Sequence, residues 1–264
     1  MLIPLFIGAL FAATTISHAQ TRPEFRDGAW LETLTSLEDP RWLLEDLVCR
    51  GCSVEALEYA RAVLADPASD DRSLEELRTE FFEYNRDHLA SLMSAAGRAA
   101  AAGYDQLDDP VNECIPSGFF FAAGPLPIWI EQHDDRVLLR YEFWHSVRTV
   151  FTDGRDHPSD LEPSRLGHSI GWYDDSHTLV VETVGFVPHI FGAISGVDGL
   201  RTSDRARAIE RYTLSEDGER VDIQVTVVDP VVLKRPYTYT GSRLLDPNVE
   251  YLDEPQCEAL SGVR

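Results

Sequence analysis

His145 is the residue whose position best suits it to acid–base chemistry. It lies in segment 136–151, where the odd positions are otherwise mostly apolar and would form one face of a β-strand. A histidine on such a face titrates near neutral pH, so it could act as a general acid or base. The alternative is a core histidine that hydrogen-bonds to backbone or to a carboxylate.

Glu182 is the carboxylate expected to work with His145. It lies in segment 178–184, which is apolar on both faces, so we expect it to be partly buried and to need a partner. Four side chains could supply that partner: Arg148, Arg211, His145 and His168. In an enzyme, His145 would be the base, Glu182 would orient it or act as the acid, and Arg148 or Arg211 would stabilise developing negative charge.

A second use of the same region is ligand binding. Three aromatic side chains, Tyr141, Phe143 and Trp172, could form the wall of a pocket, and a few polar groups, His168 among them, could orient a ligand. Glu210 precedes Arg211 and is interpreted as part of an ordinary charged pair on a strand ladder.

Other familiar site patterns receive less support. Residues 167–171 match the G-x-S-x-G motif of α/β-hydrolases, but the predicted flanks are a loop and a β-hairpin instead of the required strand and helix. His145, His168, Glu182 and His189 lack the spacing of known metal motifs, so no metal site is predicted. No glycine-rich phosphate loop occurs, and no cofactor is predicted.

The start of the chain predicts export. Residues 2–13 are apolar and uncharged, and the small-x-small sequence at 17–19 is typical of a signal-peptide cleavage site, which gives a signal peptide over 1–19. No later apolar run is long enough to cross a bilayer. We therefore expect a periplasmic or secreted protein.

Four cysteines in an exported chain favour disulfides. Cys49 and Cys52 form a C-x-x-C between two predicted helices, which favours a local structural disulfide over a redox site. We expect Cys114 and Cys257 to form the second bridge, across the two ends of the β region.

The formal net charge is −22. Such a chain repels the backbone of nucleic acids, so a nucleic-acid partner is not expected.

Residues 20–110 are predicted to form a small helical module. Trp42, Leu43, Leu44 and Leu47 indicate a helix near 40–48. Ser53 is the expected N-cap of a helix over 54–64, and Ser73 with Glu76 forms a capping box before a longer helix that fades through an alanine-rich stretch to Gly103.

Residues 111–264 are predicted to be a mainly β domain. Turn sequences separate three hairpins, over 128–144, 169–186 and 208–228, and a last strand covers 237–245. About eight strands with this spacing favour an antiparallel barrel or sandwich, and we prefer the barrel because it can enclose buried polar groups.

From Cys114 onward the chain resembles a widespread group of exported, functionally uncharacterised bacterial proteins. The resemblance rests on segments around 114–116, 141–148, 153–158, 167–171, 179–186, 210–211 and 229–230. It covers a little over half of the chain and implies export, but no activity.

Three functions remain open. The first is an exported barrel that binds a small, largely apolar molecule. The second is a lyase or isomerase that uses the His145 and Glu182 chemistry. The third is a structural envelope protein that docks through its helical module.

Overall fold

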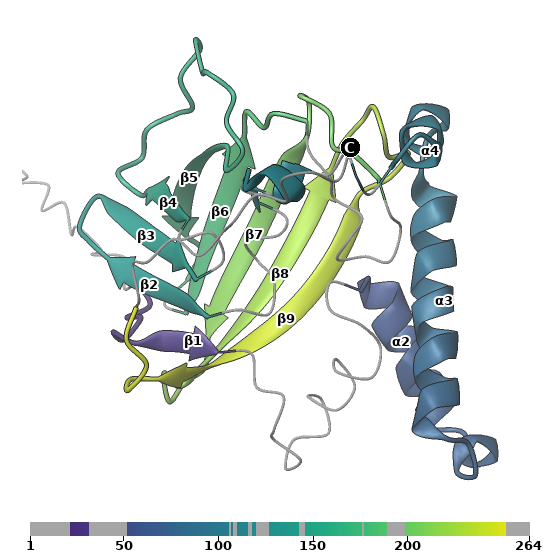
Figure 1. Cartoon of the computed structure of the whole chain (residues 1–264). Coiled ribbons are helices and arrows are strands. Elements are labelled where there is room, and N and C mark those ends of the chain that lie inside the picture. The colour runs from purple at the N-terminus through teal and green to yellow at the C-terminus, as the bar shows by residue number, and fades with distance from the viewer. Residues whose placement is uncertain are drawn as a thin grey trace, which may run out of the picture.

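The computed structural model describes residues 22–31, 52–105, 107, 110–115, 118–119, 127–142, 146–175, 177–188 and 199–251. Nine strands follow one another in chain order around a closed barrel (Figure 1). All neighbouring pairs are antiparallel except β4 and β5, which are parallel. The prediction of a mainly β, barrel-like fold preceded by a small helical module is therefore confirmed.

The strand bounds match the predicted hairpins closely. The strands are β1 (Ala29–Leu31), β2 (Ile128–Gln132), β3 (Arg136–Tyr141), β4 (Val147–Phe151), β5 (His168–Tyr173), β6 (Thr178–Val184), β7 (Arg207–Leu214), β8 (Arg220–Val228) and β9 (Tyr237–Asp246). Alternating burial along β3 and β7 shows one face turned to the barrel interior and the other outward.

The helices are α2 (Val54–Leu64), η1 (Pro67–Ser69), α3 (Leu74–Leu92), α4 (Ala95–Ala102) and η3 (Pro110–Glu113). The Ser53 side chain caps α2, and Ser73 and Glu76 form the predicted capping box of α3. The alanine-rich stretch does not prolong α3, because Met93 is extended and Ser94 caps α4 as a separate helix. The expected helix at 40–48 lies outside the described residues. No helix among the described residues is long and apolar enough to cross a membrane.

The barrel takes its first strand from the segment that was predicted to be helical. β1 pairs with both β2 and β9, although it is only three residues long. The prediction that residues 20–110 form a helical module is therefore wrong for 29–31. The cause is length, because three residues are too few to show a strand period.

β1 closes the barrel over a short seam only. It pairs with the last residues of β9, Leu244, Leu245 and Asp246. Among the described residues, the corresponding edge of β9 over 237–243 has one isolated bridge, between Ser53 and Tyr239. We call residues 237–243 the helix-facing edge of β9. Helices α2 and α3 lie beside this edge (Figure 1).

The core consists of two large apolar clusters. One cluster joins α3 to residues of β7, β8 and β9, and the other fills the part of the barrel that β1 closes. Along the inner face of β7, Ala208 belongs to the first cluster, whereas Tyr212 and Leu214 belong to the second. Glu210 lies between them, so a charged residue occupies the place where the two clusters meet.

The cysteine positions are only partly described. Cys52 is 1% exposed and packs in a small cluster with α2 and Phe81 of α3, and no cysteine of the described residues is free. Cys49 and Cys257 lie outside the described residues, so both expected pairings stay predictions.

Candidate functional site

A buried ion pair lies at the centre of the barrel. Arg148 of β4 and Glu210 of β7 make two hydrogen bonds, from Nη1 to Oε2 at 2.7 Å and from Nη2 to Oε1 at 2.8 Å. Their side chains are 2% and 1% exposed. This two-point geometry is the strongest form of an arginine–carboxylate contact, and burial makes each charge dependent on the other.

Neighbouring hydroxyl groups complete the hydrogen bonding of this pair. The Tyr212 hydroxyl donates to Glu210 Oε1 at 2.6 Å and accepts from Arg148 Nη2 at 3.2 Å. Thr183 Oγ1 accepts from Arg148 Nη1 at 3.5 Å and also contacts Ser169 Oγ at 2.9 Å. We call these five side chains the inner polar cluster. Its members satisfy one another almost completely, as buried polar groups must.

Aromatic rings cover the guanidinium of Arg148. Its Cζ atom lies 4.7 Å from the ring centre of Phe119 and 5.9 Å from that of Tyr141. An arginine between two rings gains cation–π attraction and is shielded from water. Tyr141, predicted to line a pocket, therefore lies in the barrel interior beside this ion pair.

Burial and charge fix the protonation states of the cluster. Burial alone would lower the pKa of Arg148, but the charge of Glu210 and the nearby tyrosines raise it well above its usual value. Burial raises the pKa of Tyr141 to about 12, and burial with the charge of Glu210 raises the pKa of Tyr212 well above its usual value. These three groups keep their protons near neutral pH, so none of them acts as a general base there.

Tyr239 differs from the other tyrosines of the interior. Its side chain is on the inner face of β9 and is 7% exposed, yet its hydroxyl has no hydrogen-bond partner among the described residues. Burial, followed by the charge of Glu210, raises its pKa. A buried hydroxyl without a partner lowers stability by about 1–3 kcal/mol, so its presence needs an explanation.

Space is available at Gly241, which follows Tyr239 on the inner face of β9. A Cβ atom there would meet no atom of the described residues within 4 Å. Its cross-strand neighbour Ile223 on β8 is only partly buried, although it points inward. By contrast, a Cβ on Gly171 of β5 would approach Val150 to 2.8 Å. As far as the described residues show, the interior is thus filled at Gly171 and open at Gly241.

The other predicted site residues do not join this interior set. Glu182 lies on the outer face of β6, because its neighbour Thr183 points inward, and it pairs with Arg207 at 3.0 Å. Its side chain is 23% exposed, so the expected partial burial is confirmed. Of its four predicted partners, Arg148 pairs with Glu210 instead, and Arg211 with Asp174 at 2.8 Å. His168 faces outward and His145 lies outside the described residues.

The remaining predicted residues lie outward or cannot be placed. Trp172 is 45% exposed on the outer face of β5, so it lines no interior wall. His168 also faces outward, since Ser169 points inward. His145 and Phe143, as well as His189, lie outside the described residues.

Sequence reasoning missed Glu210, Tyr212 and Tyr239. The interpretation of Glu210 with Arg211 as a ladder pair is wrong, because adjacent strand residues point to opposite faces. The alternation Ala208, Glu210, Tyr212, Leu214 places Glu210 on the apolar face, and this signal would have marked it as buried.

The G-x-S-x-G motif forms no nucleophile elbow. Ser169 lies within β5, and its hydroxyl contacts Thr183. Gly167 has a φ of 68°, which only glycine adopts without strain, and it leads the chain into the strand.

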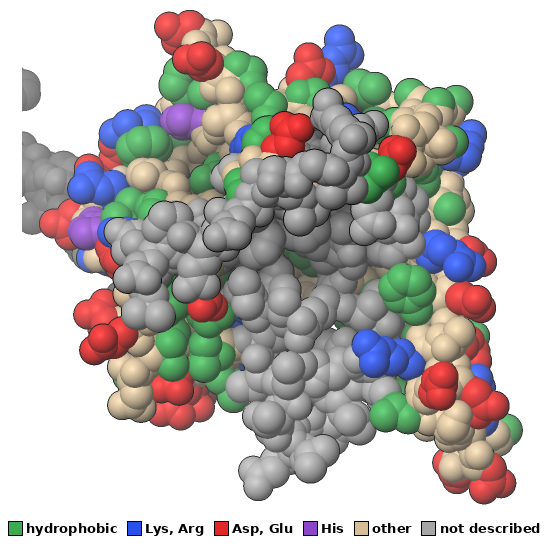
Figure 2. All heavy atoms as spheres, viewed as in Figure 1, with side chains coloured by type: hydrophobic (Ala, Val, Ile, Leu, Met, Phe, Trp, Pro, Cys, Tyr) green, Lys and Arg blue, Asp and Glu red, His purple; other side chains and the backbone are tan. Residues whose placement is uncertain are grey.

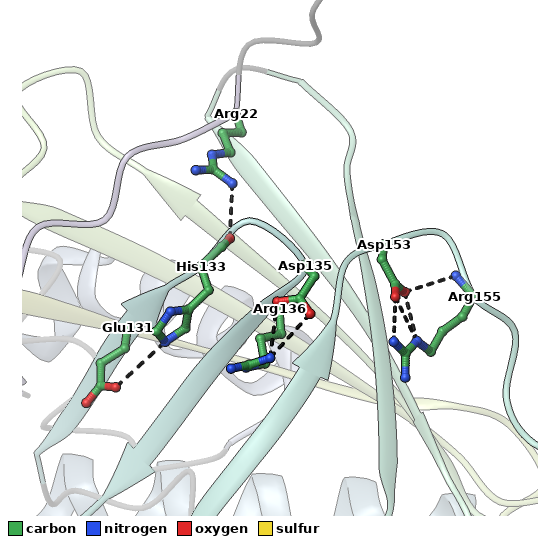
Figure 3. Close-up of polar contacts among 7 residues, drawn as sticks. All are labelled: Arg22, Glu131, His133, Asp135, Arg136, Asp153 and Arg155. Carbon is green, nitrogen blue, oxygen red and sulfur yellow. Dashed lines mark hydrogen bonds and ion pairs between the residues drawn. The ribbon is translucent and has the colours of Figure 1, made fainter.

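Surface charges around the turns pair locally. At the β2–β3 turn, Arg22 donates to the carbonyl of His133 at 3.1 Å, and Asp135 contacts Arg136 at 3.2 Å (Figure 3). Asp153 and Arg155 pair after β4 in the same view. Exposed pairs of this kind contribute little to stability. Acidic side chains also lie scattered around the face in Figure 2.

A pair of histidines lies outside the barrel. The Nδ1 atoms of His157 and His168 are 2.8 Å apart, and the ring of His168 stacks on Phe151. Burial, His157 and Arg155, in that order, lower the pKa of His168. The described residues contain no group of three histidine, cysteine, aspartate or glutamate side chains suited to a metal ion.

The lowered pKa of His168 predicts a pH effect on stability. As the pH falls below about 6.5, the unfolded chain takes up a proton at this residue before the folded chain does, so the folded state loses stability. We expect His168→Asn to reduce the loss of unfolding free energy between pH 7 and pH 5, measured by urea denaturation. The exposed His177 is the control, and an equal effect of His177→Asn would contradict this assignment.

Comparisons of the chain with models of protein families, with curated proteins and with solved structures found no match. The resemblance to exported bacterial proteins therefore stays a prediction, and function has to be argued from the geometry.

Proposed function

We propose that this protein binds a small, largely apolar molecule inside its barrel, beside the helix-facing edge of β9. The observation that carries the proposal is the space at Gly241 on the inner face of β9, where a Cβ atom would meet no atom of the described residues within 4 Å. A binding site in a barrel is typically apolar with a few polar groups that orient the ligand, and this arrangement has both.

The surroundings support a binding role over acid–base catalysis. Arg148 and Glu210 are held in the wall by each other and by Tyr212, and Arg148 and Tyr212 keep their protons near neutral pH. Glu182 faces outward, away from this set. The lyase or isomerase alternative thus gains no support, and the structural alternative predicts no bound molecule.

Export, a periplasmic or secreted location and the two disulfides belong to the same proposal. They rest on the signal-like residues 1–19 and on the four cysteines. A carrier outside the cytoplasm would meet apolar molecules that are poorly soluble in water.

The test is native mass spectrometry of the mature protein purified from its own host's periplasm or medium, followed by denaturing identification of any bound molecule. We expect a co-purifying small organic molecule. A ligand-free mass, with no small molecule recovered at micromolar protein, would contradict the proposal.

Filling the free space should block binding. We expect Gly241→Leu to reduce the co-purifying molecule at least tenfold, because the new side chain would occupy the space where a Cβ atom meets no atom of the described residues within 4 Å. Circular dichroism of the variant checks that it stays folded. Gly171→Ala is the control for a glycine without free space beside it, since its Cβ would clash with Val150. Such overpacking should lower the unfolding free energy by about 1–3 kcal/mol. Native mass spectrometry measures ligand occupancy, and thermal melts measure the loss of stability. Full ligand occupancy in Gly241→Leu would refute this location of the binding site.

A further inference from the structure

The first part of the loop between β4 and β5 depends on one histidine for its contact with the barrel. Residues 153–160 are all exposed except His157, which is partly buried. Among the described residues, its contact with His168 is the only hydrogen bond that joins 156–163 to the rest of the chain. His168 is the first residue of β5 and faces outward, so this contact ties the loop to the outer face of the sheet.

The facing nitrogens of the two rings can share only one proton. The Nδ1 atoms of His157 and His168 are 2.8 Å apart, so one of them carries a hydrogen and donates while the other accepts. Two neutral rings of opposite tautomer meet this condition. When both rings are protonated, both Nδ1 atoms carry a hydrogen, and two donors cannot bond to each other. Full protonation therefore breaks the contact.

The surroundings of the pair also disfavour a positive charge. The Nε2 atom of His157 is buried and has no partner among the described residues, so a charged N–H there would be unsatisfied. The ring of His168 stacks on Phe151, and the Cζ atom of Arg155 lies 4.0 Å from the centre of that same ring. A charge on His168 would thus add to the positive charge of Arg155.

The carboxylates near the pair already have partners. The charged residues on the loop and on the outer face beside it pair as Asp153 with Arg155 (Figure 3) and Glu182 with Arg207, and Asp135 of the β2–β3 turn also acts on Arg155. Across the ladder from His168 lies the uncharged Val184, and the outward residues of β4 are uncharged. Among the described residues, no carboxylate forms an ion pair with either histidine.

Release of this contact would stay local. From Ser164 onward, backbone hydrogen bonds to Gly185 and Val187 hold the chain just after β6. Leu161 lies against Gly185 as well. Residues 153–160 can thus move away while the strands stay paired, and this movement would uncover the ring of Phe151.

We propose that His157 and His168 form an acid-sensitive latch, which holds residues 153–160 against the barrel at neutral pH and releases them in acid. In the open loop each imidazole is free to take up a proton near its usual pKa of about 6.5. The closed form therefore loses stability as the pH falls below about that value. The latch does not depend on the proposed binding function.

Limited proteolysis of the mature protein tests the latch. The protease is a glutamyl endopeptidase, which cleaves after aspartate and glutamate and stays active in mild acid. Cleavage after Asp156 and Asp160 reports release of the loop, and cleavage after Glu216 in the exposed β7–β8 turn corrects for the effect of pH on the protease itself. We expect the ratio of loop cleavage to turn cleavage to rise at least fivefold from pH 7 to pH 5.

Three variants separate the latch from a general effect of acid. His157→Phe and His168→Phe keep an aromatic ring but take up no proton, so each should show the same cleavage ratio at both pH values. His177→Phe is the matched control, because His177 is exposed and lies outside the pair, and it should keep the rise. Circular dichroism at both pH values checks that the variants are folded.

The cleavage ratios decide the matter. A wild-type ratio that stays constant between pH 7 and pH 5 would overturn the latch. An equal rise in the wild type and in the two pair variants would overturn it as well, since the release would then have another cause. A rise that disappears in both pair variants and persists in His177→Phe supports it.

Discussion

Replacing Arg148 by methionine is expected to lower the free energy of unfolding by about 3–5 kcal/mol. The substitution leaves Glu210 buried and charged. Of the donors that now contact its carboxylate, only the Tyr212 hydroxyl remains. An isolated buried carboxylate is strongly unfavourable, so the folded state must admit water or protonate Glu210. Urea denaturation followed by circular dichroism measures the change.

Two further variants identify the cause of this loss. In the double variant Arg148→Met with Glu210→Leu both charges are absent, and we expect it to be more stable than Arg148→Met alone. Arg211→Met is the matched control, because Arg211 pairs with Asp174 at the surface and should change stability by no more than about 1 kcal/mol. A double variant as unstable as the single one would show that packing, and not the unpaired charge, explains the effect.

Hairpins were the most predictable part of this fold. Turn sequences between alternating segments marked β2–β3, β5–β6 and β7–β8, and the structure pairs each of these in antiparallel register. The information is local, since a hairpin needs only neighbouring residues and a turn. The capping residues Ser53 and Ser73 are local in the same way, and both were correct.

The inner polar cluster was harder to predict because its contacts are remote in sequence. Arg148 and Glu210 are 62 residues apart, and their contact depends on the closure of the whole barrel. The alternation along β7 places Glu210 on an apolar face, but the alternation over 136–151 places Arg148 on the opposite, mixed face. The pattern is not continuous there, because β3 ends at Tyr141 and β4 begins at Val147. Glu182 was misplaced for a related reason: its strand is apolar on both faces, so the pattern did not define the inner side.

Closure of the barrel predicts the second large effect. Trp30 is the middle residue of β1, is fully buried and packs edge to face on Phe25, with ring centres 6.2 Å apart. We expect Trp30→Ala to lower the free energy of unfolding by about 3–5 kcal/mol, as large aromatic truncations in a core do. Thermal and urea unfolding of the purified variant measure it.

The location of Trp30 makes this more than a packing defect. β1 is the only strand among the described residues that joins β2 to β9, and it does so over three residues. We therefore expect faster amide hydrogen exchange at Leu244 in Trp30→Ala, while Leu245, whose N–H donates to the Glu219 carbonyl, and the β7–β8 ladder keep their protection. Trp172→Ala is the control, since Trp172 is 45% exposed on the outer face and should change stability little. If exchange rises equally in every strand, the seam is not a separate weak point, and the barrel opens as one unit.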